Sequence, residues 1–255
     1  ALPFIQKTFH AQDWQLEIVI SSCVLGAFFG CLASGPLTDK YGRKRLMFAT
    51  SLVFIIGTLI AAYAQSLLQL TLGRFSLGIA IGVASFISPL FISEIAPPNQ
   101  RGRLVLWNQA FLTGGQVIAF FCGYYFTRHG NWQAMLLTGI APAICLCAGT
   151  FLMPYSPKWL ASKGKHQQAL SVLKKLRINH QQAIEELNQF PKHLSIKKNP
   201  FKELWHGPAR PILFVGLFLG ICQQFCGINT IMYYGPSIMG NIGFKGAHAQ
   251  ILGTL

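Results

Sequence analysis

Charged residues are scarce in this sequence, and acidic ones are scarcer still. Asp, Glu, Lys and Arg together make up 11% of the 255 residues, and only seven of these residues are Asp or Glu. A soluble domain carries about a quarter charged residues, so this composition argues against one. The sequence holds instead 52% hydrophobic residues, a mean hydropathy of +0.42 and long stretches without any charge. This pattern predicts an all-α polytopic membrane protein.

The apolar segments also lack the groups of residues that catalysis needs. They hold no carboxylate pair, no cluster of metal ligands and no nucleophile beside a base, which argues against a membrane enzyme. All seven cysteines fall in apolar segments, where cysteine behaves as a small buried hydrophobe; a disulfide or metal role is the alternative. Cys222 and Cys226 have the spacing of a metal pair, but no His or acid lies near them in the sequence. We expect no enzymatic activity, no metal and no organic cofactor.

The sequence has neither an initiator methionine nor a signal peptide with a basic region and a cleavage site. It begins at Ala1 and ends with "ILGTL", where a new apolar segment is starting. These two features predict an internal piece of a longer protein, with its first and last spans cut.

About 20 apolar residues span a bilayer, and the hydropathy pattern predicts six complete spans. These spans cover residues 14–37, 46–65, 67–93, 104–127, 132–153 and 211–242. Residues 1–9 resemble the end of an earlier span, and the segment from Ala247 onward resembles the start of a later one. We expect three parts: a membrane bundle over 1–153, a cytoplasmic linker over 154–210, and the start of a second bundle over 211–255.

Lysine and arginine are distributed unevenly over the loops. Seventeen of them lie on alternate loops, within residues 38–45, 94–103 and 154–210, whereas the opposite side holds three and Arg74 lies inside a span. Loops rich in Lys and Arg stay in the cytoplasm, so these three segments are predicted to be cytoplasmic. Topology then explains the net charge of +14, and we expect no nucleic-acid partner.

The linker over 154–210 is the only long polar segment of the sequence. Its stretches "KGKHQQALSVLKKLR" and "HQQAIEELNQF" carry apolar residues three and four positions apart, which predicts short amphipathic helices. So few residues cannot bury a sizeable core of their own. We therefore expect helices lying under the membrane part, without a separate folded domain.

Pairs of glycines recur within the spans at a spacing that lets helices approach closely. They are Gly26 with Gly30, Gly78 with Gly82, and Gly216 with Gly220. We interpret them as helix-packing positions, with a ligand contact as the alternative.

The stretch "CQQFCGINTIMYYGP" (222–236) places several polar side chains inside an apolar run. Burying an amide costs free energy unless it is hydrogen-bonded. These amides therefore bind either a polar ligand or other helices, because amides also hold membrane helices together.

Four ordered motifs indicate a family. They are "GPLTDKYGRKR" (35–45), "GRFSLGIAIGVASFISPLFISEIAPPNQRGRLVLWNQ" (73–109), "PYSPKWL" (154–160) and "QQFCGINTIMYY" (223–234). Together they resemble the sugar porter family of the major facilitator superfamily, in particular its bacterial galactose, arabinose and xylose proton symporters. The resemblance covers the whole chain, and it implies part of the major facilitator fold, from the end of the first helix to the start of the eighth.

The resemblance implies a sugar-binding site. In the family's pattern, Gln223, Gln224 and Asn229 hydrogen-bond the sugar, and Tyr233 and Tyr234 help to close the outer gate. On a straight helix Asn229 would lie about 120° away from Gln223. We therefore expect the helix to unwind near Gly227, as broken helices do in transporters.

The resemblance also implies that Gln109, on the fifth helix, contacts the sugar. Gln116 follows seven residues later on the same face, about 10 Å away. A polar packing role is the alternative for both residues.

Arg74 lies inside a span, where an arginine costs about 2.5–3.5 kcal/mol on insertion scales. In the family's proton symporters the matching arginine pairs with a first-helix aspartate that carries the proton, so the resemblance implies a role in proton coupling. That aspartate would precede Ala1. The alternative is that Arg74 extends to the outer surface, about 10 Å away.

The resemblance further implies a cytoplasmic ion-pair network that holds the outward-facing state. Its matching residues here are Asp39, Arg43, Glu94, Arg101 and Arg103. The alternative is a set of surface pairs, each worth under about 1 kcal/mol.

Two positions in the motif "PYSPKWL" (154–160) depart from the family's pattern. Tyr155 stands where the family has glutamate, and Lys158 stands where it has arginine. The change at Tyr155 removes an acidic partner. The change at Lys158 replaces the bidentate guanidinium of arginine with the single ammonium charge of lysine. We therefore expect a weaker latch and a bias toward the inward-facing state.

The resemblance implies secondary transport of a monosaccharide by alternating access, with a proton as the coupling ion. An uncoupled facilitative sugar transporter and a transporter-like sugar sensor are the alternatives. We expect a multi-pass protein of the bacterial inner membrane, because the first outer loop is short and no Asn-x-Ser/Thr sequon is present. The sequence carries no signal for an oligomeric state.

Overall fold

The computed structural model describes residues 2–128, 131–177, 180–190 and 210–227, and within these ranges the regular structure is entirely helical. The chain forms two compact units, Ala1–Lys192 and His193–Leu255. The helices at the start of the predicted linker therefore belong to the same unit as the first bundle. The predicted domain boundaries at 153 and 210 stay predictions.

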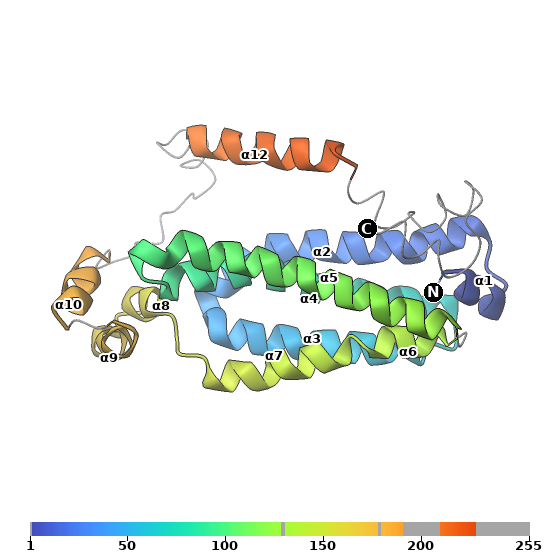
Figure 1. Cartoon of the computed structure of the whole chain (residues 1–255), viewed down its shortest axis with the longest axis horizontal. Helices are drawn as coiled ribbons and strands as arrows, with labels where there is room; N and C mark the ends of the chain where they lie inside the picture. Colours follow the sequence, from blue (N-terminus) through green and yellow to red (C-terminus); the bar gives the residue numbers. More distant parts are fainter. Residues whose placement is uncertain (1, 129–130, 178–179, 191–209, 228–255) are drawn as a thin grey trace. The chain divides into compact units, whose positions relative to one another are not determined.

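Within the described residues of the first unit, five helical segments are long and apolar enough to cross a membrane. They are α2 (Asp13–Tyr41), α3 (Arg43–Ala62), α4 (Leu67–Ile95), α5 (Arg101–Arg128), and the succession of α6 (Trp132–Leu137) and α7 (Ile140–Leu152) (Figure 1). They confirm the first five predicted spans. The sixth is described only as α12 (Arg210–Phe225), and its remainder lies outside the described residues.

Three details differ from the prediction. The span over 132–153 is interrupted at Thr138 and Gly139, because Pro142 has no N–H to donate to the carbonyl of Thr138. Pro36, predicted at a helix end, lies inside α2. The predicted loop over 38–45 is almost wholly helical, since Gly42, with φ of +86°, joins α2 to α3 by itself.

Helices α2 and α4 pack backbone to backbone through glycines. A Cβ at Gly78 would lie 2.1 Å from the carbonyl oxygen of Cys23, and one at Gly26 would lie 2.2 Å from that of Phe75. Gly30 and Gly82 are equally close to the opposite helix. The structure thus confirms two of the three predicted glycine pairs as packing positions. A Cβ at Gly216 or Gly220 would meet no described atom of another segment within 4 Å.

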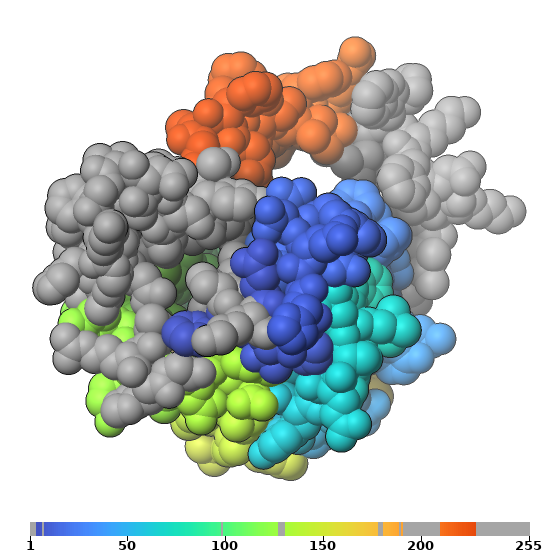
Figure 2. Space-filling model, turned by 90° about the vertical axis from the view of Figure 1, so that its right-hand side faces the viewer, coloured from blue at the N-terminus to red at the C-terminus, as the bar shows by residue number. Residues whose placement is uncertain are grey.

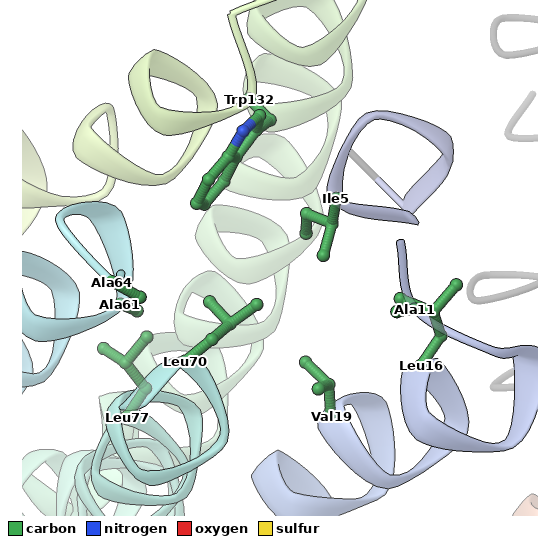
Figure 3. Close-up of a cluster of buried hydrophobic side chains, with 9 residues drawn as sticks. All are labelled: Ile5, Ala11, Leu16, Val19, Ala61, Ala64, Leu70, Leu77 and Trp132. Carbon is green, nitrogen blue, oxygen red and sulfur yellow. The ribbon is translucent and has the colours of Figure 1, made fainter. Parts of the chain in front are cut away.

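A hydrophobic cluster closes the end of the first unit that lies opposite the basic loops. It gathers side chains from α1 (Leu2–Phe9) to α6: Ile5, Ala11, Leu16, Val19, Ala61, Ala64, Leu70, Leu77 and Trp132 (Figure 3). Figure 2 looks onto this end, with α1 in dark blue. Ile5 and Leu70 are completely buried, so α1 is fixed on the ends of α2 and α4.

The opposite end carries three short helices, α8 (Pro157–Ser162), α9 (His166–Leu176) and α10 (His180–Gln189) (Figure 1). Helices α9 and α10 confirm the two predicted amphipathic helices, whereas α8 was not predicted. Ser156 caps α8, accepting a hydrogen bond from the amide of Trp159, and Pro157 occupies the first helical position. A small apolar core holds the three helices together; its buried members are Trp159, Leu160, Ala161 and Ala169, and Val172, Leu187 and Phe190 pack on them.

Candidate functional site

A buried ion pair lies at the end of the first unit that carries the basic loops. Arg43, at the start of α3, donates from Nη2 to Oε1 of Glu94, in the last turn of α4, over 2.8 Å. The side chains are only 9% and 4% exposed. The other carboxylate oxygen of Glu94 accepts a 2.6 Å hydrogen bond from the hydroxyl of Ser156. Both oxygens of Glu94 are thus bonded to groups from two other segments of the chain.

Asp39 joins this pair at its edge. One of its oxygens lies 3.5 Å from Nη1 of Arg43, one turn further along the chain, but the Asp39 side chain is 80% exposed. An exposed pair of this kind is worth little, so Glu94 is the partner that balances the charge of Arg43.

The other two cations of the predicted network lie apart from it. Arg101 and Arg103 are exposed on the first turn of α5 and form no ion pair with any described residue. The structure therefore brings together Asp39, Arg43 and Glu94, and leaves out these two arginines.

Tyr155, the residue that replaces a family glutamate, lies between a cation and an aromatic ring. The ammonium of Lys44 is 5.2 Å from the centre of its ring, and the ring stacks on Trp159 at 6.4 Å with 19° between the planes. Lys44 also donates to the carbonyls of Phe151 (3.0 Å) and Met153 (2.7 Å), at the end of α7. Lys44 thus holds the end of α7 without a carboxylate partner at position 155.

Three residues of this end were not singled out from the sequence: Lys44, Ser156 and Arg177. Arg177, directly after α9, donates to Glu186 and to the carbonyls of Ile95 and Ala96. The Ser-Pro pair at 156–157 marks a helix start and could have indicated Ser156. Lys44 and Arg177 each lie among several other cations, and nothing in the sequence distinguishes them.

The predicted coupling residue, Arg74, lies in the first half of α4 and is partly buried. It precedes Gly78 by one turn, and Gly78 touches the backbone of Cys23 on α2. Arg74 is therefore one turn away from one of the close glycine contacts between α2 and α4.

The glutamines of the predicted sugar site lie on two helices. Gln109 is exposed and Gln116 partly buried on α5, two turns apart on one face. In the second unit, Gln223 and Gln224 are exposed in the last turn of α12. The first pair belongs to the first unit and the second pair to the second unit.

Helix α12 of the second unit ends close to Gly227, where unwinding is predicted from the sequence. Helix α12 stops at Phe225, and Gly227 has φ of +70°, with its amide donating to the carbonyl of Gln224 over 3.2 Å. Asn229, Tyr233 and Tyr234 lie outside the described residues. Gln224 and Gly227 thus stand on either side of this helix end.

No group of three or more His, Cys, Asp or Glu side chains within the described ranges has a geometry that could hold a metal.

Comparison with known proteins gives one consistent result. Residues 5–255 match the family described as "Sugar (and other) transporter". The chain is 39% identical over 256 residues to the arabinose-proton symporter of Escherichia coli K12, covering 100% of this chain and 54% of that protein. It is 38% identical over 262 residues to the galactose-proton symporter of the same strain, covering 100% and 55%. The D-xylose transporter of Levilactobacillus brevis is 33% identical, with 99% and 55% covered.

The chain spans about half the length of these relatives. Among solved structures, it resembles the major facilitator superfamily proton:xylose symporter XylE bound to 6-bromo-6-deoxy-D-glucose. The TM-score is 0.82 at 24% identity, covering 98% of this chain and 59% of that one. This likeness shows the fold. The chain belongs to the sugar (and other) transporter family.

Proposed function

We propose that the protein, at its full natural length, carries a monosaccharide across the bacterial inner membrane by alternating access, in symport with a proton. The observation that carries this proposal is the 39% identity to an arabinose-proton symporter along the entire chain. The galactose-proton symporter, at 38%, supports the same coupling. Transport, and not catalysis, is the activity of the family.

The proposed sugar site consists of Gln109, Gln116, Gln223, Gln224 and Asn229. An amide both donates and accepts hydrogen bonds, as a sugar hydroxyl does. Neutral side chains also suit a neutral sugar, because no charge has to lose its water when the substrate enters. The exposed positions of Gln109 and Gln223 support this assignment, since neither amide is enclosed within its own unit.

Tyr233 and Tyr234 are proposed to close the outer gate, Arg74 to take part in proton coupling, and the group of Asp39, Arg43 and Glu94 to stabilise the outward-facing state. Arg101 and Arg103 keep a proposed place in this network only if they meet a partner outside the first unit. The buried Arg43–Glu94 pair supports this assignment most directly.

The test is sugar uptake by the protein, expressed at its full natural length, in energy-depleted cells or proteoliposomes. Galactose, glucose, xylose and arabinose are added separately, while labelled uptake and external pH are recorded together. Proton symport predicts uptake with alkalinisation of the medium, and the sugar that gives it is the substrate. Uptake without a pH change would make the protein a facilitator, and sugar binding without uptake would favour a sensor.

A further inference from the structure

Arg177 is a buried cation at the end of a helix that lies far from it in the sequence. It follows α9, yet its Nη1 donates to the carbonyl of Ile95 over 2.9 Å and its Nη2 to that of Ala96 over 3.4 Å, 82 and 81 residues away. These two carbonyls end α4. The last carbonyls of a helix have no partner inside it and carry partial negative charge, so a guanidinium satisfies both needs.

Glu186 makes the burial of this cation possible. Its two carboxylate oxygens accept from Nε and Nη2 of Arg177 over 2.8 and 2.9 Å, in a bidentate pair. The side chains are 5% and 16% exposed. A buried charge is tolerated when its hydrogen bonds are satisfied, and here the planar fork serves a carboxylate and two carbonyls at once. A lysine offers a single nitrogen and cannot reproduce this arrangement.

The same turn of α4 also carries Glu94. Glu94 is bonded to Arg43 and Ser156, while the next two residues are bonded to Arg177. Two arginines thus hold this turn of α4. Arg43 binds the side chain of Glu94, and Arg177 binds the backbone carbonyls of the next two residues. A shift of this turn would move the carboxylate of Glu94 away from both of its partners.

We propose that Arg177 is a positioning residue for the buried Arg43–Glu94 pair, and that Glu186 orients it. The same contacts attach α9 and α10 to α4, so the cytoplasmic helices move with the first bundle as one body. The bond from the indole nitrogen of Trp159 to the carbonyl of Asp39 (3.1 Å) adds a second attachment, to α2. The role of this attachment in alternating access rests on the proposed function, whereas the contacts themselves do not depend on it.

Hydrogen–deuterium exchange of the protein at its full natural length tests the proposal. The amide of Ala96 bonds to Ile92 at the end of α4, and the amide of Trp159 bonds to the Ser156 hydroxyl, so these two amides report on the turn and on the partner of Glu94. Arg177→Met is expected to raise exchange at both about tenfold. Arg177→Lys is expected to give nearly the same increase, because it keeps the charge and loses the fork.

Two matched controls and a milder variant complete the experiment. Glu185→Gln and Lys174→Gln change exposed neighbours on α10 and α9 and are expected to leave both amides unchanged. If Arg177→Met does not fold, Arg177→Lys and Glu186→Gln decide the question. Faster exchange confined to residues 166–190, with Ala96 and Trp159 as in the wild type, would show that Arg177 only joins the linker helices to one another.

Sugar uptake is measured on the same variants. A positioning role predicts that Arg177→Lys lowers the maximal rate severalfold and leaves KM unchanged, because the sugar site is intact. A rise in KM with an unchanged maximal rate would contradict it. Absence of uptake in the wild type would overturn the proposed function, while the exchange result would still decide the role of Arg177.

Discussion

The indole ring of Trp159 packs directly on Gly42, the residue that joins α2 to α3. A Cβ at Gly42 would lie 2.9 Å from the ring, and the backbone there has φ of +86° and ψ of 157°. This region is essentially restricted to glycine. The turn between α2 and α3 and the packing of α8 on it therefore both require a residue without a side chain at position 42.

Gly42→Ala is expected to destabilise the protein by about 2–4 kcal/mol, because it combines backbone strain with a clash against the ring. Gly164→Ala is the matched control: Gly164 also has positive φ (+77°) but no neighbour within 4 Å. It should cost only about 1–2 kcal/mol. Unfolding in detergent, followed by tryptophan fluorescence, measures both; equal losses would show that the ring contact contributes nothing.

Gly78→Ala is expected to separate α2 from α4, because the added methyl would overlap the carbonyl of Cys23. Overpacking of this kind costs about 1–3 kcal/mol. Gly35→Ala, on α2, is the control, since Gly35 has no neighbour within 4 Å. The free energy of unfolding should fall for Gly78→Ala and stay level or rise for the control. A tolerated Gly78→Ala would mean that the helices lie further apart.

Glu94→Gln is expected to cost about 3–5 kcal/mol, because it leaves Arg43 as a buried charge without its counterion. The double variant Arg43→Met with Glu94→Met should recover most of this loss, since no charge is then buried. Asp39→Asn serves as the exposed control and should cost under about 1 kcal/mol. A double-mutant cycle on the free energy of unfolding measures the coupling; additive losses would refute the pair's importance.

Tyr155→Glu is expected to shift the protein toward the outward-facing state. A carboxylate at this position would meet Lys44, whose ammonium now faces the Tyr155 ring at 5.2 Å, and would restore the acidic partner that the family has. Cysteine crosslinking specific to the outward-facing state should increase. Tyr155→Phe keeps the ring and should leave crosslinking at the wild-type level. An unchanged yield in Tyr155→Glu would count against the weakened latch.

Arg74→Gln is expected to abolish sugar accumulation and to spare counterflow, if Arg74 acts in proton coupling. Counterflow needs only the sugar site and the conformational change, whereas accumulation also needs the proton. Both are measured in the protein at its full natural length, with the exposed Lys165→Gln as control. Accumulation at the wild-type level would assign Arg74 a structural role.

The membrane helices could be predicted from the sequence because bilayer thickness fixes their length. The break at Thr138 could not, since proline is tolerated in many membrane helices and Pro142 alone does not decide whether a helix is interrupted. The packing roles of Gly26 and Gly78 could be predicted, because closely packed membrane helices carry small residues four positions apart in the sequence.

The candidate site was predictable only in part. Arg43 and Glu94 stand in family motifs, and the structure pairs them. Arg177 is one of eleven cations in the linker, and only the fold brings it to α4. The same holds for Lys44, whose acceptors lie 107 and 109 residues away. Long-range contacts between polar groups leave no periodic pattern from which they could be found.

These sequence separations also set an order of events during translation. A ribosome adds roughly 5–20 residues per second, so about 4–16 seconds pass between the synthesis of Ile95 and that of Arg177. Arg43 precedes Glu94 by 51 residues, so it is already made when Glu94 is synthesised. The carbonyls at the end of α4 and the ammonium of Lys44 are made before their partners, which follow much later in the chain. A nascent chain released in that interval would carry a paired Glu94 on an uncapped helix. The end of this unit that carries α8, α9 and α10 is thus the last part to be completed as the protein is made.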